Sequence, residues 1–320
     1  MKKCCLLITI ICTICSSVAI AQHYEKVAFG DFEQWKVRNI KESRIIGGKT
    51  RVIYAIAPTD TVRQNEALTF AKGNPWSQSN AYAKVSGVEK ASGTVRPEYR
   101  DKENGYCCRM DSKLEELTAL GIIDMKLLVA GNIFTGRSIE PIKTAKDPYQ
   151  NMDYGVPFTK RPAALVFDYK ATISPENTIT FAKGTGKPKM IEGHDEAQVF
   201  CLLQKRWEDS EGNIHALRVG TAFERINKDQ KTWVNNHQTP IHYGDITKKS
   251  FYKDYMKLDN VMRARNSKGQ IVPIQEEGWA AEGTTPTHII ISFGSGCYEA
   301  FVGREGNTLW IDNIKLLYND

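Results

Sequence analysis

The sequence predicts an all-β protein, a jelly-roll β-sandwich of two antiparallel sheets. Short runs rich in Val, Ile, Phe, Tyr and Thr alternate with turn-rich connections along the chain. Segments 30–35 and 308–318, near the two ends, both have the character of strands. No internal repeat or linker divides the chain between them, and many strands in one region favour two packed sheets.

Each end segment carries an acid where an apolar residue would be expected. Because side chains alternate along a strand, Glu33 shares a face with Trp35, and Asp312 shares one with Trp310 and Ile314. An unpaired buried carboxylate is costly, so each should find a hydrogen-bond donor, a cation or a sheet end. The pattern predicts a sandwich that is closed by its own termini.

Nine strands are predicted after segment 30–35, and the last of them is segment 308–318. They are 50–57, 67–72, 105–111, 125–130, 163–173, 197–207, 215–220, 287–293 and 308–318. Strand 163–173 places Asp168 and Lys170 on the face opposite its apolar residues, and strand 197–207 does the same with Gln198 and Gln204. These polar faces are either solvated surface or a concave face that holds a ligand. One segment, 251–265, has apolar residues at helix-like spacing.

The first residues of the chain predict a signal peptide. Lys2 and Lys3 precede an apolar stretch and Ala19-Ile20-Ala21, which predicts cleavage after residue 21 and a single jelly-roll domain over 22–320. The stretch is shorter than the ~20 residues of a membrane span, and no later segment is long enough to cross a bilayer. We therefore expect export to the periplasm, the cell surface or the medium.

Charge and cysteine usage exclude some classes of function. The net charge is +6, but acids and bases are mixed without a basic stripe, so no nucleic-acid partner is expected. The mature chain would keep Cys107, Cys108, Cys201 and Cys297. Their spacing does not fit a structural zinc site, and the sequence leaves disulfides and buried free thiols as alternatives.

Two predicted loops, 73–100 and 135–161, exceed the ~12–15 residues beyond which structureless connections are uncommon and often functional. The first contains Trp76, and the second contains Tyr149 and Tyr154. Both loops are therefore candidates to border a binding site.

Several segments resemble the family described as the putative carbohydrate metabolism domain. The similarity runs in order over nearly the whole chain and is carried by Ile45-Ile46-Gly47-Gly48, Gly73-Asn74-Pro75-Trp76-Ser77, Gly155-Val156-Pro157-Phe158-Thr159, Phe167-Asp168-Tyr169-Lys170 and Thr308-Leu309-Trp310-Ile311-Asp312. The resemblance implies an exported jelly roll of gut bacteria, similar in shape to carbohydrate-binding modules and some glycoside hydrolases. It also implies a glycan pocket on the concave sheet.

Sugars are held by flat aromatic rings and by planar polar groups in mostly apolar pockets. On this basis the candidate sugar-binding residues are Trp76, Tyr149, Tyr154, Arg161, Asp168, Lys170, Gln198 and Gln204. The alternatives are that the rings pack against the edge of the sandwich and that Asp168 and Lys170 are merely solvated.

Catalysis is the less favoured expectation. Glycoside hydrolysis needs two carboxyl groups, about 5–5.5 Å apart in retaining enzymes and about 6.5–9.5 Å apart in inverting ones. Asp168 and Glu196 are the weak catalytic candidates, with Asp195 as a competitor for Glu196. Nothing in the sequence indicates that either pair converges, so binding without catalysis is preferred.

A structural Ca²⁺ is a further expectation, from similarity to jelly-roll carbohydrate modules. Such modules often hold the ion between an early Phe-Glu and a late Asp, positions that Glu33 and Asp312 resemble. The alternatives are that Asp312 caps backbone amides or that a β-bulge turns it outward.

The sequence thus predicts an exported glycan-binding protein, accessory to polysaccharide use, that binds an oligo- or polysaccharide on its concave sheet. A glycoside hydrolase or lyase with carboxylates in the same pocket is one alternative. A surface adhesin or assembly subunit is the other.

Overall fold

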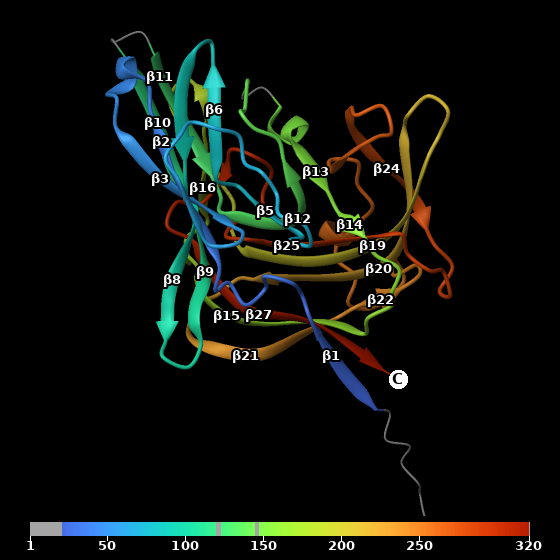
Figure 1. The fold of residues 1–320 in the computed structure, drawn as a ribbon. Coiled ribbons are helices and arrows are strands. Elements are labelled where there is room, and N and C mark those ends of the chain that lie inside the picture. The colour runs from blue at the N-terminus through green and yellow to red at the C-terminus, as the bar shows by residue number, and fades with distance from the viewer. Residues whose placement is uncertain (1–20, 120–122, 145–146, 320) are drawn as a thin grey trace, which may run out of the picture.

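Two sheets packed face to face form the centre of the protein, as Figure 1 shows. The computed structural model describes residues 21–119, 123–144 and 147–319. The six-stranded sheet has the order β21-β15-β27-β9-β8, with β1 beside β27. Its strands are β1 (Gln22–Lys26), β8 (Val95–Asp101), β9 (Gly105–Asp111), β15 (Ala164–Thr172), β21 (Gln230–Pro240) and β27 (Thr308–Asn319).

The ten-stranded sheet has the order β13-β12-β25-β19-β20-β24-β23, with three short strands paired alongside. Its strands are β5 (Trp76–Gln78), β12 (Asn132–Ser138), β13 (Met152–Tyr154), β14 (Val156–Pro157), β19 (Ala197–Glu208), β20 (Ile214–Ile226), β22 (His242–Tyr243), β23 (Arg263–Arg265), β24 (Ile271–Trp279) and β25 (His288–Gly294). Apart from the parallel pair of β20 and β24, the neighbours are antiparallel. The predicted all-β jelly-roll sandwich is confirmed.

Smaller sheets rise beside the sandwich at the left of Figure 1. Their strands are β2 (Trp35–Lys41), β3 (Thr50–Ile56), β4 (Asp60–Val62), β6 (Ala81–Val85), β7 (Val88–Ser92), β10 (Lys113–Ala119), β11 (Ile123–Val129), β16 (Thr178–Phe181), β17 (Lys183–Thr185), β18 (Lys189–Glu192) and β26 (Val302–Gly303). The predicted loop 73–100 is therefore wrong, because β5, β6, β7 and nearly all of β8 lie within it. The predicted loop 135–161 contains the end of β12 together with β13 and β14.

Helical structure in the described part of the chain is confined to three 3₁₀ turns, η1 (Arg44–Ile46), η2 (Pro148–Asn151) and η3 (Asp254–Met256). The helix-like spacing of 251–265 does not produce an α-helix. Met256 and Met262 are buried and Tyr255 packs against Phe223, so tertiary contacts hold this segment as a 3₁₀ turn and the short strand β23. No helix among the described residues is long and apolar enough to span a membrane.

The two ends of the described chain lie side by side. β1 pairs with β27 over its whole length, with Gln22 opposite Asn319, so the predicted closure by the termini is confirmed. The strand predicted at 30–35 is wrong, since residues 28–31 form a turn and β2 begins at Trp35. Phe29 and Phe32 have φ values of 57° and 50°, so the chain reverses direction there. The predicted strand 67–72 is not a strand either.

A bulge divides β27 into two halves. Leu309 and Ile311 face the core before the bulge and Ile314 faces it afterwards, while Asp312 faces outward. Asn313, with φ of 53°, supplies the extra residue. The predicted sharing of a face by Asp312 and Ile314 is therefore wrong. Both alternatives are observed, because the bulge turns Asp312 outward and its carboxylate accepts the backbone N–H of Asn313 at 2.8 Å.

The main core fills the space between the sheets. Phe167 and Ile311 from the six-stranded sheet meet Val199, Leu203 and Phe293 from the ten-stranded sheet, all fully buried. Each such side chain contributes about 1.5–3 kcal/mol by leaving water. All four cysteines of the described chain are free, and Cys107, Cys108 and Cys201 are buried.

A second core covers half of the outer face of the ten-stranded sheet. Phe134, Leu202 and Ile290 point outward from that sheet and are buried against Tyr154 and Met262. Beside them, Glu276 accepts hydrogen bonds from both Arg218 and Gln204, and the side chains of all three are almost completely buried. This half of the face is closed to a ligand.

The Arg218–Glu276 pair generates a prediction about stability. Glu276→Ala should lower the free energy of unfolding by about 3–5 kcal/mol, because the buried Arg218 guanidinium loses its compensating charge. Glu277→Ala, on the neighbouring half-exposed side chain, is the control and should cost less than about 1 kcal/mol. Urea denaturation measures both, and equal losses would contradict the assignment.

Candidate functional site

The other half of the outer face of the ten-stranded sheet carries partly exposed side chains. The hairpin of β19 and β20 bends away from the six-stranded sheet in Figure 1, which makes this face concave. Residues on the face alternate with core residues along each strand. We call the following set the concave-face cluster: Glu196, Gln198, Phe200, Phe223, Arg225 and Tyr255.

Three aromatic rings form the floor of the cluster. Phe200 and Phe223 are direct partners across β19 and β20, and their ring centroids lie 5.3 Å apart with the planes inclined by 25°. Tyr255, from η3, lies 5.1 Å from Phe223. Phe223 contacts both other rings, so the three rings form one continuous apolar surface.

Charged and amide groups border these rings. The Arg225 guanidinium lies 4.2 Å from the centroid of Tyr255 and 3.6 Å from the Glu196 carboxylate. Nε of Arg225 is buried and has no acceptor among the described residues. Gln198 is the direct strand partner of Arg225. The Gln198 amide and the Arg225 guanidinium thus lie one same-face position from the Phe200–Phe223 pair, and the Glu196 carboxylate lies next to Arg225.

A cavity of about 200 Å³ adjoins Phe223 at the edge of the sheet. Phe251 and His242 stack in its wall with centroids 4.0 Å apart, and Glu224 contributes a carboxylate. Burial lowers the pKa of His242. The cavity extends the apolar surface beyond the cluster.

Asp195 anchors the loop that borders the cluster. Its carboxylate accepts backbone N–H groups from Glu196, Cys297 and Arg304 at 2.7–3.0 Å. Burial raises the pKa of Asp195. Because both oxygens of its carboxylate accept backbone N–H groups, Asp195 holds the loop in place, and its partly exposed neighbour Glu196 is the acid next to the cluster.

Four of the predicted sugar-binding residues are engaged in packing. Trp76 is fully buried, and its Nε1–H donates to the carbonyl of Ala28. Tyr154 is buried against Phe134 in the second core. Gln204 is fully buried, as described above. Tyr149 is half-buried, and its hydroxyl accepts the N–H of Ala300 at the edge of the concave face.

Arg161 lies outside the cluster. Its guanidinium donates to the carbonyls of Thr284 and Glu282 and covers the ring of Tyr243 at 3.9 Å. Gln198 is therefore the one predicted sugar-binding residue with its side chain in the cluster.

The structure does not bring Asp168 and Glu196 together. Asp168 lies on the outer face of the six-stranded sheet, whereas Glu196 precedes β19 in the ten-stranded sheet. The main core separates the two faces. A catalytic pair of these two acids is therefore excluded by the topology.

Asp168 lies on the outer face of the six-stranded sheet, between a bulge of β21 at Asn236 and the bulge of β27 at Asn313. Its Oδ1 accepts the N–H of Asn236, which has φ of 52°, and its Oδ2 accepts from the Asn313 amide. Nη1 of Arg100 donates to Asp168 at 2.9 Å and to Asp312 at 2.7 Å. Both acids thus share one buried guanidinium.

The same face carries a row of indole rings and cations. Arg100 covers Trp233 at 3.9 Å from the ring centroid, and Lys170 lies 4.4 Å from Trp310. Arg109 lies 4.9 Å from the other side of the Trp310 ring system. Cation–π contacts of this kind contribute about 0.5–2 kcal/mol each.

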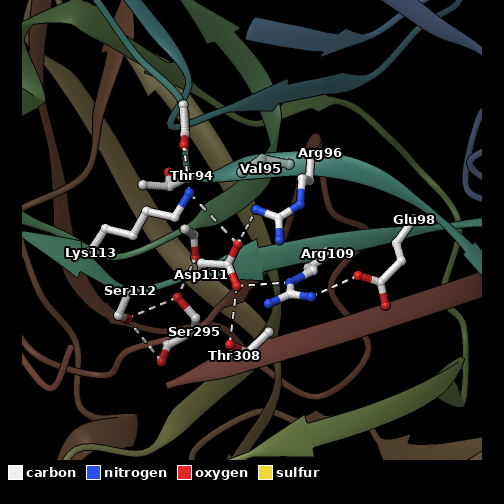
Figure 2. A network of polar contacts seen from close by, with 12 residues as sticks. Thr94, Val95, Arg96, Glu98, Arg109, Asp111, Ser112, Lys113, Ser295 and Thr308 are labelled. Carbon is white, nitrogen blue, oxygen red and sulfur yellow. Dashed lines mark hydrogen bonds and ion pairs between the residues drawn. The ribbon is translucent and has the colours of Figure 1, made fainter. Parts of the chain in front are cut away.

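Figure 2 shows the neighbouring network around Asp111. Its carboxylate accepts from Arg96 at 2.6 Å, Arg109 at 2.9 Å and Thr308 at 3.1 Å. Arg109 also donates to Glu98. Arg96 of β8 and Arg109 of β9 thus bind the acids of this network. The bond from Thr308 to Asp111 joins these strands to β27.

The predicted calcium ligands have other partners. Glu33 accepts the N–H of Tyr106, and Asp312 accepts from Arg100, so a guanidinium supplies the positive charge at that carboxylate. Among the described residues, no three His, Cys, Asp or Glu side chains gather as a metal site would require. Both carboxylates therefore accept from donors of the protein itself, and the structural calcium stays an untested prediction.

The sequence patterns missed most of the cluster. Phe223, Arg225 and Tyr255 were not identified, because β20 was predicted to end at Gly220 and 251–265 had helix-like spacing. The register shift opposite Leu203 and Gln204 reverses the alternation along β20, so a regular strand continued from residues 215–220 would have placed Phe223 and Arg225 on the core face.

The fold and the cluster define a class, namely jelly-roll proteins with an aromatic and polar concave face. The chain belongs to the family described as the putative carbohydrate metabolism domain, whose model matches residues 31–317. A search of curated proteins gave no match.

Two solved structures match this chain at low sequence identity. One is described as a putative glycoside hydrolase from Bacteroides thetaiotaomicron, with 17% identity, a TM-score of 0.44, and coverage of 89% of this chain and 71% of that one. The other is described as a putative glycoside hydrolase from Bacteroides vulgatus, with 16% identity, a TM-score of 0.43, and coverage of 71% and 78%.

The Asp312 carboxyl generates a prediction about pH. Burial and the nearby charge of Asp168 raise the pKa of Asp312 to about 7, even though Arg100 donates to it. Between the unfolded value and about 7 the folded protein therefore binds a proton that the unfolded chain lacks, so this group's contribution to stability falls as pH rises through 7. The melting temperature of Asp312→Asn relative to wild type should rise by about 2 °C or more between pH 5 and pH 8.

Calorimetry at the two pH values measures this difference. Asp31→Asn, at an exposed carboxyl of the turn after β1, is the control and should show no such change. A constant offset between wild type and Asp312→Asn at both pH values would contradict the raised pKa.

Proposed function

We propose that the protein is an exported glycan-binding protein that holds sugar rings on the concave-face cluster. The observation that carries the proposal is the partly exposed floor of Phe200, Phe223 and Tyr255, bordered by Arg225 and Glu196. Apolar C–H faces of a sugar would stack on these rings, and its hydroxyl groups would bond to the guanidinium, carboxylate and Gln198 amide. Membership in a family named for carbohydrate metabolism supports this substrate class.

Export is part of the proposal. The predicted signal peptide covers residues 1–21, of which the structure describes only residue 21. The strand β1 begins at Gln22, directly after the predicted cleavage site. A protein of this kind would meet polysaccharide in the periplasm, at the cell surface or in the medium.

Binding should depend on the floor and border of the cluster. A glycan array with protein lacking residues 1–21 would identify a ligand, and calorimetric titration would then compare variants. Phe223→Ala and Arg225→Ala should each weaken binding at least about tenfold, equivalent to about 1.4 kcal/mol, through lost stacking and lost hydrogen bonds. Tyr99→Ala, at an exposed ring on the β8–β9 hairpin, is the control and should bind like wild type.

If both cluster variants bind like wild type, the concave face is not the site. If no glycan on the array is retained and a pull-down recovers a protein partner, the adhesin or assembly-subunit function replaces glycan binding.

Hydrolysis is the second candidate function, favoured by one observation. Burial raises the pKa of Asp259. The backbone N–H of Asp259 donates to Glu276 of the ten-stranded sheet, and Glu196 is a partly exposed acid beside the same sheet. A glycosidase requires two carboxyl groups, one of which donates a proton to the leaving group. Release of reducing ends from the bound glycan, abolished in Glu196→Gln and in Asp259→Asn, would establish catalysis, and retention of intact glycan would establish binding alone.

A further inference from the structure

The outer face of the six-stranded sheet carries three lysines without an acidic partner. Lys26 of β1 and Lys315 of β27 are direct partners across the antiparallel pair, so two like charges lie side by side. Lys315 is also the partner of Val166, two residues before Asp168 on β15, which places Lys170 on the same face. Within the described ranges, none of the three ammonium groups forms an ion pair with a carboxylate.

Like charges opposite one another in a sheet destabilise it unless something neutralises them. Every arginine of this face has a carboxylate partner, as Arg100 does in Asp168 and Asp312 and Arg109 in Glu98. The lysines differ from the arginines, because no carboxylate of the described chain forms an ion pair with them, although the charge of Lys170 helps to lower the pKa of Glu98.

A cavity opens beside two of these lysines. It has a volume of about 190 Å³ and lies between the turn after β1 and the bulge of β27. Its lining includes Lys26, Lys315, Asn313, Asp31 and Phe29. Nζ of Lys315 donates to Asn236 at 2.8 Å, which joins the cavity to the second bulge beside Asp168.

Lys170 marks the other end of the face. Its Nζ lies 4.4 Å from the centroid of Trp310 and 5.7 Å from that of Trp233, and it bonds to no acceptor among the described residues. Trp310 is nearly buried, whereas Trp233 is partly exposed and has Arg100 against it. The ammonium group of Lys170 thus lies beside two indole rings, and its N–H groups have no hydrogen-bond acceptor among the described residues.

The two ends are separated by four residues along β15, or about 13 Å. Between them lie the amide side chains of Asn235, Asn236 and Asn313, of which the first two are exposed. A ligand that reaches both ends must therefore be elongated and must offer many hydroxyl groups to these amides.

We propose that this outer face is a second binding site, specific for an acidic polysaccharide whose sugars carry carboxylate or sulfate groups. Lys26 and Lys315 bind one anionic group at the cavity, Lys170 binds another, and Trp233 packs against the sugar ring between them. Asp31 and Glu98 lie among the cations and would repel a densely charged polyphosphate, whereas sugar hydroxyls can donate to them. The site lies on the opposite side of the main core from the concave-face cluster and does not depend on it.

Affinity electrophoresis of the mature protein in gels containing polygalacturonate, dextran sulfate or neutral dextran tests this site. The wild type should be retarded by at least one of the two acidic polymers and not by dextran. The triple variant Lys26→Gln/Lys170→Gln/Lys315→Gln should bind the retarding polymer at least tenfold more weakly.

The matched control is Lys49→Gln/Lys187→Gln/Lys189→Gln. It removes the same charge from exposed lysines of the smaller sheets, which have no ion-pair partner among the described residues, and should bind within twofold of wild type. Phe223→Ala should also retain acidic-polymer binding, which separates this site from the concave-face cluster. Melting temperatures check that each variant is folded.

Equal losses in the two triple variants would show an effect of net charge alone and overturn the site. Unchanged binding by the first triple variant, or equal retardation by neutral dextran, would also overturn it. If the first triple variant loses affinity for vesicles containing phosphatidylglycerol while its polysaccharide binding is unchanged, the face binds a membrane surface and the proposal is wrong.

Discussion

The central position of β27 in the six-stranded sheet is the constraint on which the rest of the structure depends. This strand pairs with β1, β9 and β15, so the last described segment of the chain joins its first strand to the body of the sandwich. Its inward residues, such as Ile311 and Ile314, lie in the main core on either side of the bulge. Because the bulge turns Asp312 outward, the core stays apolar while a carboxylate occupies the middle of a central strand.

Buried charges elsewhere follow the same physical rule, since an ionised group away from water needs a partner. Arg218 of β20 pairs with Glu276 of β24, and Arg38 of β2 pairs with Glu140. The first of these pairs, with the second core, closes half of the concave face. The remaining half keeps aromatic rings partly exposed next to a guanidinium, and this division determines where a ligand has room.

The two outer faces of the sandwich differ in character, and this difference bears on function. The concave face offers stacked rings with few charges, which suits the neutral parts of a sugar chain. The opposite face offers lysines without acidic partners beside indole rings, which suits anionic groups. If both proposed sites bind, a polysaccharide held at two points would be retained more strongly than by either site alone.

The sequence by itself determined the all-β class, the position of most long strands, the closure by the termini and the family, because alternation and β-branched composition are local properties. It did not determine which face each polar residue occupies. Asp168 and Gln198 both alternate with apolar neighbours, yet they lie on opposite outer faces, since a strand pattern does not say to which sheet the strand belongs. Short polar strands such as β5, the bulges at Asn236 and Asn313, and the burial of Trp76 depend on contacts between residues far apart in sequence, and only the tertiary structure decided them.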